Sequence, residues 1–179
     1  MDLPHFAYHP DPIASGSVET SDAVCRCCGK TRGYIYTGPV YSEEDLEAAL
    51  CPWCIADGSA HEKFGASFAD AAVIPDGVPR SVIEEVAYRT PGFASWQNGE
   101  WPACHNDAAA FIEPVGHAEL QARYPQLEGT LITYIVQQMG ISGGAAHQLY
   151  RTLDRDKGPT AYVFHCRHCD NQPVYIDML

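Results

Sequence analysis

Apolar and polar residues along the chain alternate in short runs, which predicts short strands mixed with short helices. Over residues 31–41, aromatic and β-branched residues lie on both sides of Gly38-Pro39, a pattern typical of a strand, a turn and a returning strand. Residues 162–164 and 174–176 are similar runs on either side of a Cys-x2-Cys pair, so they predict a second hairpin. The first twenty residues are rich in Pro, Gly and Ser and predict an extended arm, in which His5 and His9 are expected to be solvated rather than to bind metal.

Helical periodicity is confined to short segments. Ser42 stands before three acidic residues and predicts a helix start, with an apolar stripe that includes Leu46 and Leu50. Ser81 is expected to cap another helix, whose apolar residues share one face. Further helices are expected over 55–68, 116–124, 128–139 and 142–153. These elements predict an α+β fold.

Two Cys-x2-Cys pairs in the first third of the chain predict a metal centre. They are Cys25 with Cys28 and Cys51 with Cys54, and each pair places two thiols one tight turn apart. Two such pairs separated by a short folded segment are typical of a four-thiolate structural zinc site in a treble-clef or ribbon-like module. The alternatives are a disulfide pair and unligated core cysteines. Cys27 lies between the first two and is expected to be a free thiol, with a redox role as the alternative.

A third pair, Cys166 and Cys169, supplies two ligands and needs two more. Cys104 and His105 are the candidates nearest in type, and we expect them to meet the third pair. Three outcomes stay open: a second closed structural zinc site, no second metal, or an open site that could activate water. Further candidates for a missing ligand are His165, His168 and Asp107.

The order of these features predicts an N-terminal arm and four-cysteine module over residues 1–70. A helical section follows over 71–179, together with the C-terminal hairpin that carries the third Cys-x2-Cys pair. The two parts are expected to pack as one globular unit. Between them, residues 70–80 form a turn-rich linker.

Composition narrows the class of protein. The chain has 179 residues, 46% of them hydrophobic, which suffices for a sizeable core. A formal net charge of −12 argues against nucleic-acid binding, which needs Lys and Arg to replace counterions. We expect no membrane span and no signal peptide, and six of the eight cysteines fall in Cys-x2-Cys pairs, so the expected location is the cytoplasm, where thiols stay reduced.

Phe93, Trp96 and Trp101, with Arg89 and Gln97 nearby, form a concentrated aromatic and polar segment. We predict that at least one of the two tryptophans lines a surface groove beside the second metal region, where a partner or ligand docks. The alternative is that both indoles are buried core.

Several segments together resemble the CbrC family, also called UPF0167. The segments that carry the resemblance are 6–12, 36–41, Cys51-Pro52-Trp53-Cys54 with its continuation to Phe64, 89–97 and 166–169. The resemblance implies a bacterial, poorly characterised protein, and the family name is tied to tolerance of colicin E2. Cys104-His105 departs from the family pattern, which has these two residues in the opposite order, and Ala109 stands where the pattern has a further cysteine. A fully thiolate second site is therefore not expected.

The resulting prediction is a cytosolic bacterial zinc-binding protein with structural zinc, which acts through interaction in a stress-tolerance role. Its partner, a protein or a small molecule, is not identified by the sequence. The alternative is a zinc-dependent hydrolase that uses the second metal site. Whether the protein is an enzyme depends on that site: four protein ligands favour the first function, and three ligands with a water favour the second.

Overall fold

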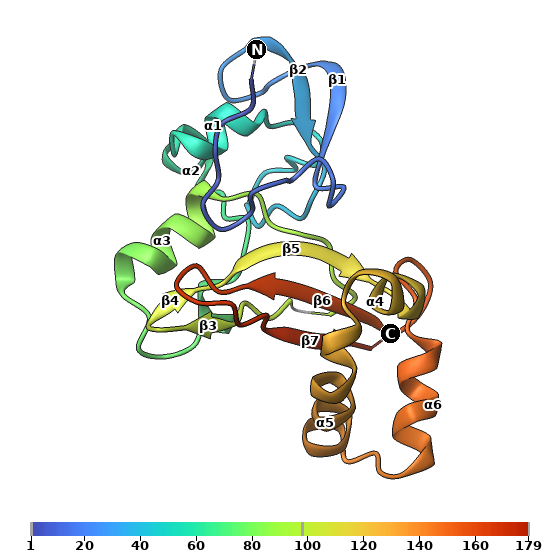
Figure 1. The fold of residues 1–179 in the computed structure, drawn as a ribbon. Helices are drawn as coiled ribbons and strands as arrows, with labels where there is room; N and C mark the ends of the chain where they lie inside the picture. The colour runs from blue at the N-terminus through green and yellow to red at the C-terminus, as the bar shows by residue number, and fades with distance from the viewer. Residues whose placement is uncertain (1, 98, 179) are drawn as a thin grey trace.

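The computed structural model describes residues 2–97 and 99–178 and confirms the α+β class, with short helices and three small antiparallel sheets (Figure 1). The strands are β1 (Val18–Val24), β2 (Thr31–Tyr36), β3 (Ala103–Cys104), β4 (Asp107–Ala108), β5 (Ala110–Val115), β6 (Thr160–His165) and β7 (Val174–Asp177). The helices are α1 (Pro52–Ala56), α2 (Ser59–Phe64), α3 (Arg80–Arg89), α4 (His117–Arg123), α5 (Glu128–Met139) and α6 (Gly144–Thr152), with 3₁₀ turns at Ala71–Val73 and Pro125–Leu127.

The first part of the chain is built around the β1–β2 hairpin and the two short helices α1 and α2, which lie together in Figure 1. Its own apolar cluster contains three cysteines together with aromatic and aliphatic residues from the hairpin, the 46–50 loop and the helices. Such a small cluster stabilises weakly by burial alone, because small domains bury too little apolar surface. A metal ion bound by the cysteines of this cluster would therefore add substantially to the stability of this part of the chain.

The central sheet has the order β5–β6–β7, and all neighbours are antiparallel. Successive residues of β6 point to opposite faces, and both faces are covered. Ala161 and Val163 pack against α4, α5 and α6, whereas Tyr162 and Phe164 pack into an aromatic core with Phe93 and Trp101. This burial on both sides explains why β6 reads as an unbroken apolar run instead of an alternating one.

Most of the predicted elements are confirmed. The expected helices at 116–124, 128–139 and 142–153 correspond to α4, α5 and α6. The helix expected after Ser81 is α3, but the predicted cap is wrong, because the helix begins at Arg80 with Pro79 as its N-cap and Ser81 lies inside it. The predicted second hairpin is β6 paired with β7. The segment 55–68 contains α2 and the end of α1 rather than one helix, since Gly58 interrupts it with a left-handed φ of 81°.

Three local predictions are wrong. The Ser42 segment forms bends rather than a helix, although Leu46 and Leu50 are buried as its stripe required. β2 pairs with β1 rather than with residues 39–41, and Tyr41 instead forms an isolated bridge with Ser67. The arm extends only to residue 17, because residues 18–24 are strand β1.

His9 is also placed differently from the prediction, since it is fully buried. Its Nδ1 lies 2.7 Å from the Pro91 carbonyl and its Nε2 lies 2.6 Å from the Ser15 hydroxyl. Its ring meets Phe111 edge to face. The arm is therefore fixed against the body of the protein by its histidine rather than being extended in solvent. Among the described residues, no helix combines the length and apolar character needed to cross a bilayer.

Candidate metal centres

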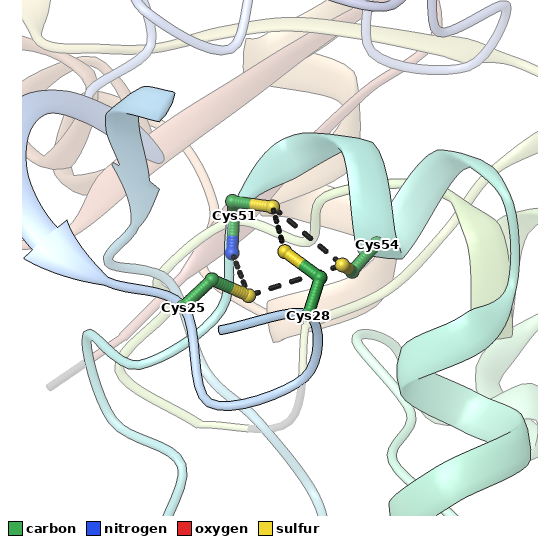
Figure 2. Close-up of side chains that lie close together, drawn as sticks. All are labelled: Cys25, Cys28, Cys51 and Cys54. Atoms are coloured by element: carbon green, nitrogen blue, oxygen red, sulfur yellow. Dashed lines mark hydrogen bonds between the residues drawn. The ribbon is translucent and has the colours of Figure 1, made fainter. Parts of the chain in front are cut away.

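The first centre brings together the two cysteine pairs of the N-terminal part (Figure 2). Cys25 and Cys28 lie in the turn between β1 and β2, which Gly29 closes with a left-handed φ of 69° and an N–H donated to the Cys25 carbonyl at 2.8 Å. Cys51 is the N-cap of α1, because Pro52 starts that helix, and Cys54 lies within its first turn. A turn and a helix start thus face each other with two thiols each.

Distances in the first centre match a tetrahedral metal site. The Sγ atoms of Cys25 and Cys54 are 3.8 Å apart, those of Cys28 and Cys51 3.9 Å, and those of Cys51 and Cys54 3.6 Å. A tetrahedral zinc ion with Zn–S bonds of about 2.3 Å would have S···S edges of about 3.8 Å. All eight cysteines are free thiols, so the disulfide alternative gains no support.

Hydrogen bonding prepares the first centre for a cation. Bonds from Cys51, including its backbone N–H at 3.3 Å, lower the pKa of the Cys25 thiol to about 4, whereas burial raises the pKa of Cys54 to about 12. One thiolate is thus readily available, and the other thiols would release protons as metal binds. Lys63 donates to the carbonyls of Arg26 (3.2 Å) and Cys27 (3.0 Å), so it places a positive charge against the turn that carries Cys25 and Cys28.

Cys27 is not one of the four grouped thiols. It lies in the same turn, its Sγ is 3.5 Å from the Ser59 hydroxyl, and it is half-buried. This position agrees with the prediction of a free thiol beside the centre.

The second centre joins residues that are far apart in the sequence. Cys104 ends β3, and His105 with Asn106 forms the two-residue turn to β4, with left-handed φ values of 57° and 55°. Both central residues of a type I′ hairpin turn adopt this conformation. Cys166 directly follows β6, and its N–H donates to the Asn171 carbonyl at 2.9 Å, which closes the turn that carries Cys169.

The predicted meeting of Cys104 and His105 with the third pair is confirmed. The Nδ1 atom of His105 lies 3.2 Å from the Cys104 Sγ, 3.6 Å from that of Cys166 and 3.8 Å from that of Cys169. The Sγ atoms of Cys104 and Cys169 are 3.9 Å apart. Around a tetrahedral zinc ion the N···S edges would be about 3.6 Å and the S···S edges about 3.8 Å. The four donor atoms thus lie within 4.8 Å of one another, as the residues around one metal ion would.

The two centres differ in exposure. Three of the four cysteines of the first centre are buried, whereas in the second centre His105 and Cys169 are exposed. Hydrogen bonding with Cys166 raises the pKa of Cys104 to about 11, and although burial opposes it, the same interaction helps to lower the pKa of Cys166 to about 6. The second centre is therefore the one that solvent and solutes can reach.

The other candidate ligands lie outside the second group of four. Asp107 is buried, accepts hydrogen bonds from the Tyr8 hydroxyl (2.8 Å) and Arg167 Nη1 (2.7 Å), and lies 2.7 Å from His168 Nε2. We call these four residues the Asp107 network. His165, at the end of β6, is exposed. Sequence reasoning missed Tyr8 and Arg167. Arg167 could have been suspected from its place between two predicted ligands, but Tyr8 carried no such signal.

The two tryptophans have different environments. Trp101 is 2% exposed and donates from Nε1 to the Ala109 carbonyl (2.8 Å), so it belongs to the core. Trp96 is 44% exposed and donates to the Thr160 hydroxyl (3.0 Å) at the start of β6. It lines a hollow of about 420 Å³. Because Cys166 follows the opposite end of β6, the predicted position of this groove beside the second centre is wrong.

Fold and sites together define an α+β protein with two sulfur-rich groups of four donors, one mostly buried and one at the surface, each of a size and composition that could hold a metal ion. A family model described as "Uncharacterised protein family (UPF0167)" matches residues 3–178, so the chain belongs to the UPF0167 family.

Relatives from distant bacteria agree with this assignment. The chain is 44% identical over 176 residues to the UPF0167 protein Mb2317 of Mycobacterium bovis, covering 98% of this chain and 93% of that protein. It is 42% identical over 185 residues to the UPF0167 protein PA1536 of Pseudomonas aeruginosa, covering 98% of this chain and 97% of that protein. No solved structure matches the chain.

Proposed function

We propose that this protein is a zinc-binding interaction protein of the bacterial cytoplasm in which both four-donor groups bind zinc as closed structural centres. The observation that carries the proposal is the convergence of eight side chains into two groups, each with its donor atoms within 4.8 Å of one another. Four sulfur and nitrogen donors at the edge lengths of a tetrahedron form the arrangement that a structural zinc site requires.

The donor sets support zinc over harder cations. Thiolate and imidazole donors in a tetrahedral arrangement suit zinc, while magnesium and calcium prefer oxygen. The sulfur-only first group would also suit iron, since four thiolates hold iron–sulfur clusters, so metal analysis must include it. In the proposed module, a knuckle between paired strands faces a second pair at a helix start, an arrangement that agrees with a treble-clef-like fold.

The hydrolase alternative has less support. It requires a metal with an open position and a nearby base. Four protein donors form the second centre, and Asp107, the carboxylate two residues after His105, is engaged by Tyr8, Arg167 and His168. We therefore propose that the metal holds the surface in shape for a partner. A role in stress tolerance, as in the colicin phenotype attached to the family name, rests on the resemblance alone.

Elemental analysis of the purified protein tests this function. We expect two equivalents of zinc per chain, one equivalent in a Cys104→Ser/Cys169→Ser variant, and little iron. Because His105 and Cys169 are exposed, a chelator should remove the second metal before the first. Less than one equivalent of metal, together with a melting temperature unaffected by strong chelator, would rule out the proposal.

A further inference from the structure

The Asp107 network connects three separate parts of the chain next to the second centre. Tyr8 comes from the N-terminal arm, Asp107 from β4, and Arg167 and His168 from the turn between β6 and β7. Arg167 Nη1 donates both to the Asp107 carboxylate (2.7 Å) and to the Tyr8 hydroxyl (2.9 Å), and its guanidinium lies 4.5 Å from the centre of the Tyr8 ring. None of the four residues belongs to the group of donors.

We propose that Asp107 is the positioning residue of the second metal centre, and that through Tyr8 it couples docking of the N-terminal arm to metal binding there. This inference rests on the proposed function, because it presupposes that the second centre binds metal. Its content is additional: it assigns a role to residues that are not ligands, and it makes an arm far away in sequence part of the site.

The position of Asp107 on the chain explains how it would align the ligands. One half of the centre is Cys104 with His105, and Asp107 lies opposite Cys104 in the β3–β4 ladder. The other half is Cys166 with Cys169, and Arg167 lies between them in sequence. The ion pair from Asp107 to Arg167 therefore ties one half to the other at a fixed distance. Such outer contacts hold ligands in the orientation that a metal needs.

Arg167 would also balance the charge of the second centre. Three thiolates around a divalent cation leave one net negative charge, and a guanidinium beside the ligands offsets it. Arg167 is about one-third exposed, so it needs partners to hold it in place, and Asp107 and Tyr8 supply them. Loss of the carboxylate would free Arg167 and also leave the buried Tyr8 hydroxyl with a weaker acceptor.

The arm is connected to this network by its backbone as well. Tyr8 accepts a hydrogen bond at its carbonyl from the Phe111 N–H (2.8 Å), and its neighbour His9 is fixed at Pro91. When Tyr8 holds Arg167 in place, an ordered arm favours the ligand geometry. By linkage, a bound metal must favour the ordered arm by the same free energy.

The chain contains a matched control for this network. Glu113 on β5 accepts a hydrogen bond from the Tyr124 hydroxyl (2.6 Å) and pairs with Arg123 (2.8 Å), and like Asp107 it is buried. It is the same combination of tyrosine, carboxylate and arginine, but it does not connect the two halves of a metal centre. Glu113→Gln and Tyr124→Phe thus show how much the loss of such a network destabilises the fold when no metal centre is involved.

The experiment compares Asp107→Asn and Tyr8→Phe with these two controls in the full-length protein. The affinity of the second centre for zinc is measured by competition with a chromophoric chelator, and the Cys104→Ser/Cys169→Ser variant defines the signal of the first centre. Cobalt(II) absorption in the same variants reports whether the ligand geometry stays tetrahedral. We expect Asp107→Asn to weaken the second centre about 10- to 100-fold, the range typical of outer-shell changes, and Tyr8→Phe to weaken it several-fold. The first centre stays loaded and shows that each variant is folded.

Hydrogen exchange tests the coupling from the other side. Removing the second metal with the Cys104→Ser/Cys169→Ser variant should raise amide exchange at Tyr8, His9 and Asp11 of the arm, and Glu113→Gln should not. The inference is overturned if the affinity of the second centre for zinc in Asp107→Asn is within threefold of that in Glu113→Gln. It is also overturned if amide exchange in the arm is the same with and without the second metal. If the unaltered protein binds only one metal, the proposed function of the second centre fails, and this inference fails with it.

Discussion

Replacing Cys51 by serine tests whether the first centre holds the N-terminal part of the fold. Cys51 is buried, makes two of the short Sγ contacts and donates its N–H to Cys25. Structural zinc contributes about 10–16 kcal/mol of apparent folding free energy in small modules, and whole domains have net stabilities of only about 5–15 kcal/mol. Loss of this metal should therefore unfold residues 18–64, whose apolar cluster is separate from the other two.

Cys27→Ser is the matched control, because it removes a thiol from the same turn but outside the group of four. We expect it to cost about 1 kcal/mol or less and to leave both metals bound. For Cys51→Ser we expect one zinc instead of two, and collapse of the amide resonances of β1, β2 and α1 while those of β5–β7 persist. Two zinc equivalents in Cys51→Ser, with a melting temperature equal to that of Cys27→Ser, would refute this reasoning.

Three further predictions concern the rest of the fold. Burial lowers the pKa of His9 to about 4, below the value of about 6.5 expected in the unfolded chain. As the pH falls, the unfolded state therefore binds a proton before the folded state does, and the free energy of unfolding should fall by about 2 kcal/mol between pH 7 and pH 5. Urea unfolding should show a smaller fall in His9→Gln, and an equal fall would contradict the assignment. Gly92→Ala should be strongly destabilising, because an added Cβ would overlap the Phe68 carbonyl oxygen, and a thermal melt close to that of the unaltered protein would show otherwise. Trp101→Ala should lower the free energy of unfolding by about 3–5 kcal/mol and Trp96→Ala by about 1 kcal/mol, measured by urea denaturation, with the reverse order as the contrary result.

The ligand groups could be predicted because metal chemistry restricts both residue type and spacing. A Cys-x2-Cys pair carries its geometry in a few residues, so Cys25 with Cys28 and Cys51 with Cys54 were recognisable without a fold. The meeting of Cys104 with Cys169 followed from the incomplete ligand set of the third pair rather than from local pattern. The helices α4 to α6 were also recognisable, because their residues favour helix locally.

Features that depend on distant contacts could not be predicted in this way. The local sequence of the Pro-rich arm does not predict that His9 is buried, because its hydrogen-bond partner Pro91 is far away in sequence. The helix expected from Ser42 fails although its apolar residues are buried, because the loop carries them into the first apolar cluster without helical turns. Strand β5 was missed because a bulge between Phe111 and Glu113 interrupts its alternation.

The two centres close loops of different length, and this sets an order for their assembly. The outermost cysteines of the first centre are 29 positions apart, and those of the second are 65 apart. By polymer statistics the longer closure costs only about 0.7 kcal/mol more. We expect the larger difference to be kinetic, because the pairing of β5 with β6 around helices α4 to α6 is what brings Cys166 close to Cys104 in the fold. If both groups bind metal as proposed, we expect the ion to stabilise the first module early in folding and to close the second centre late, on a sheet that has already formed.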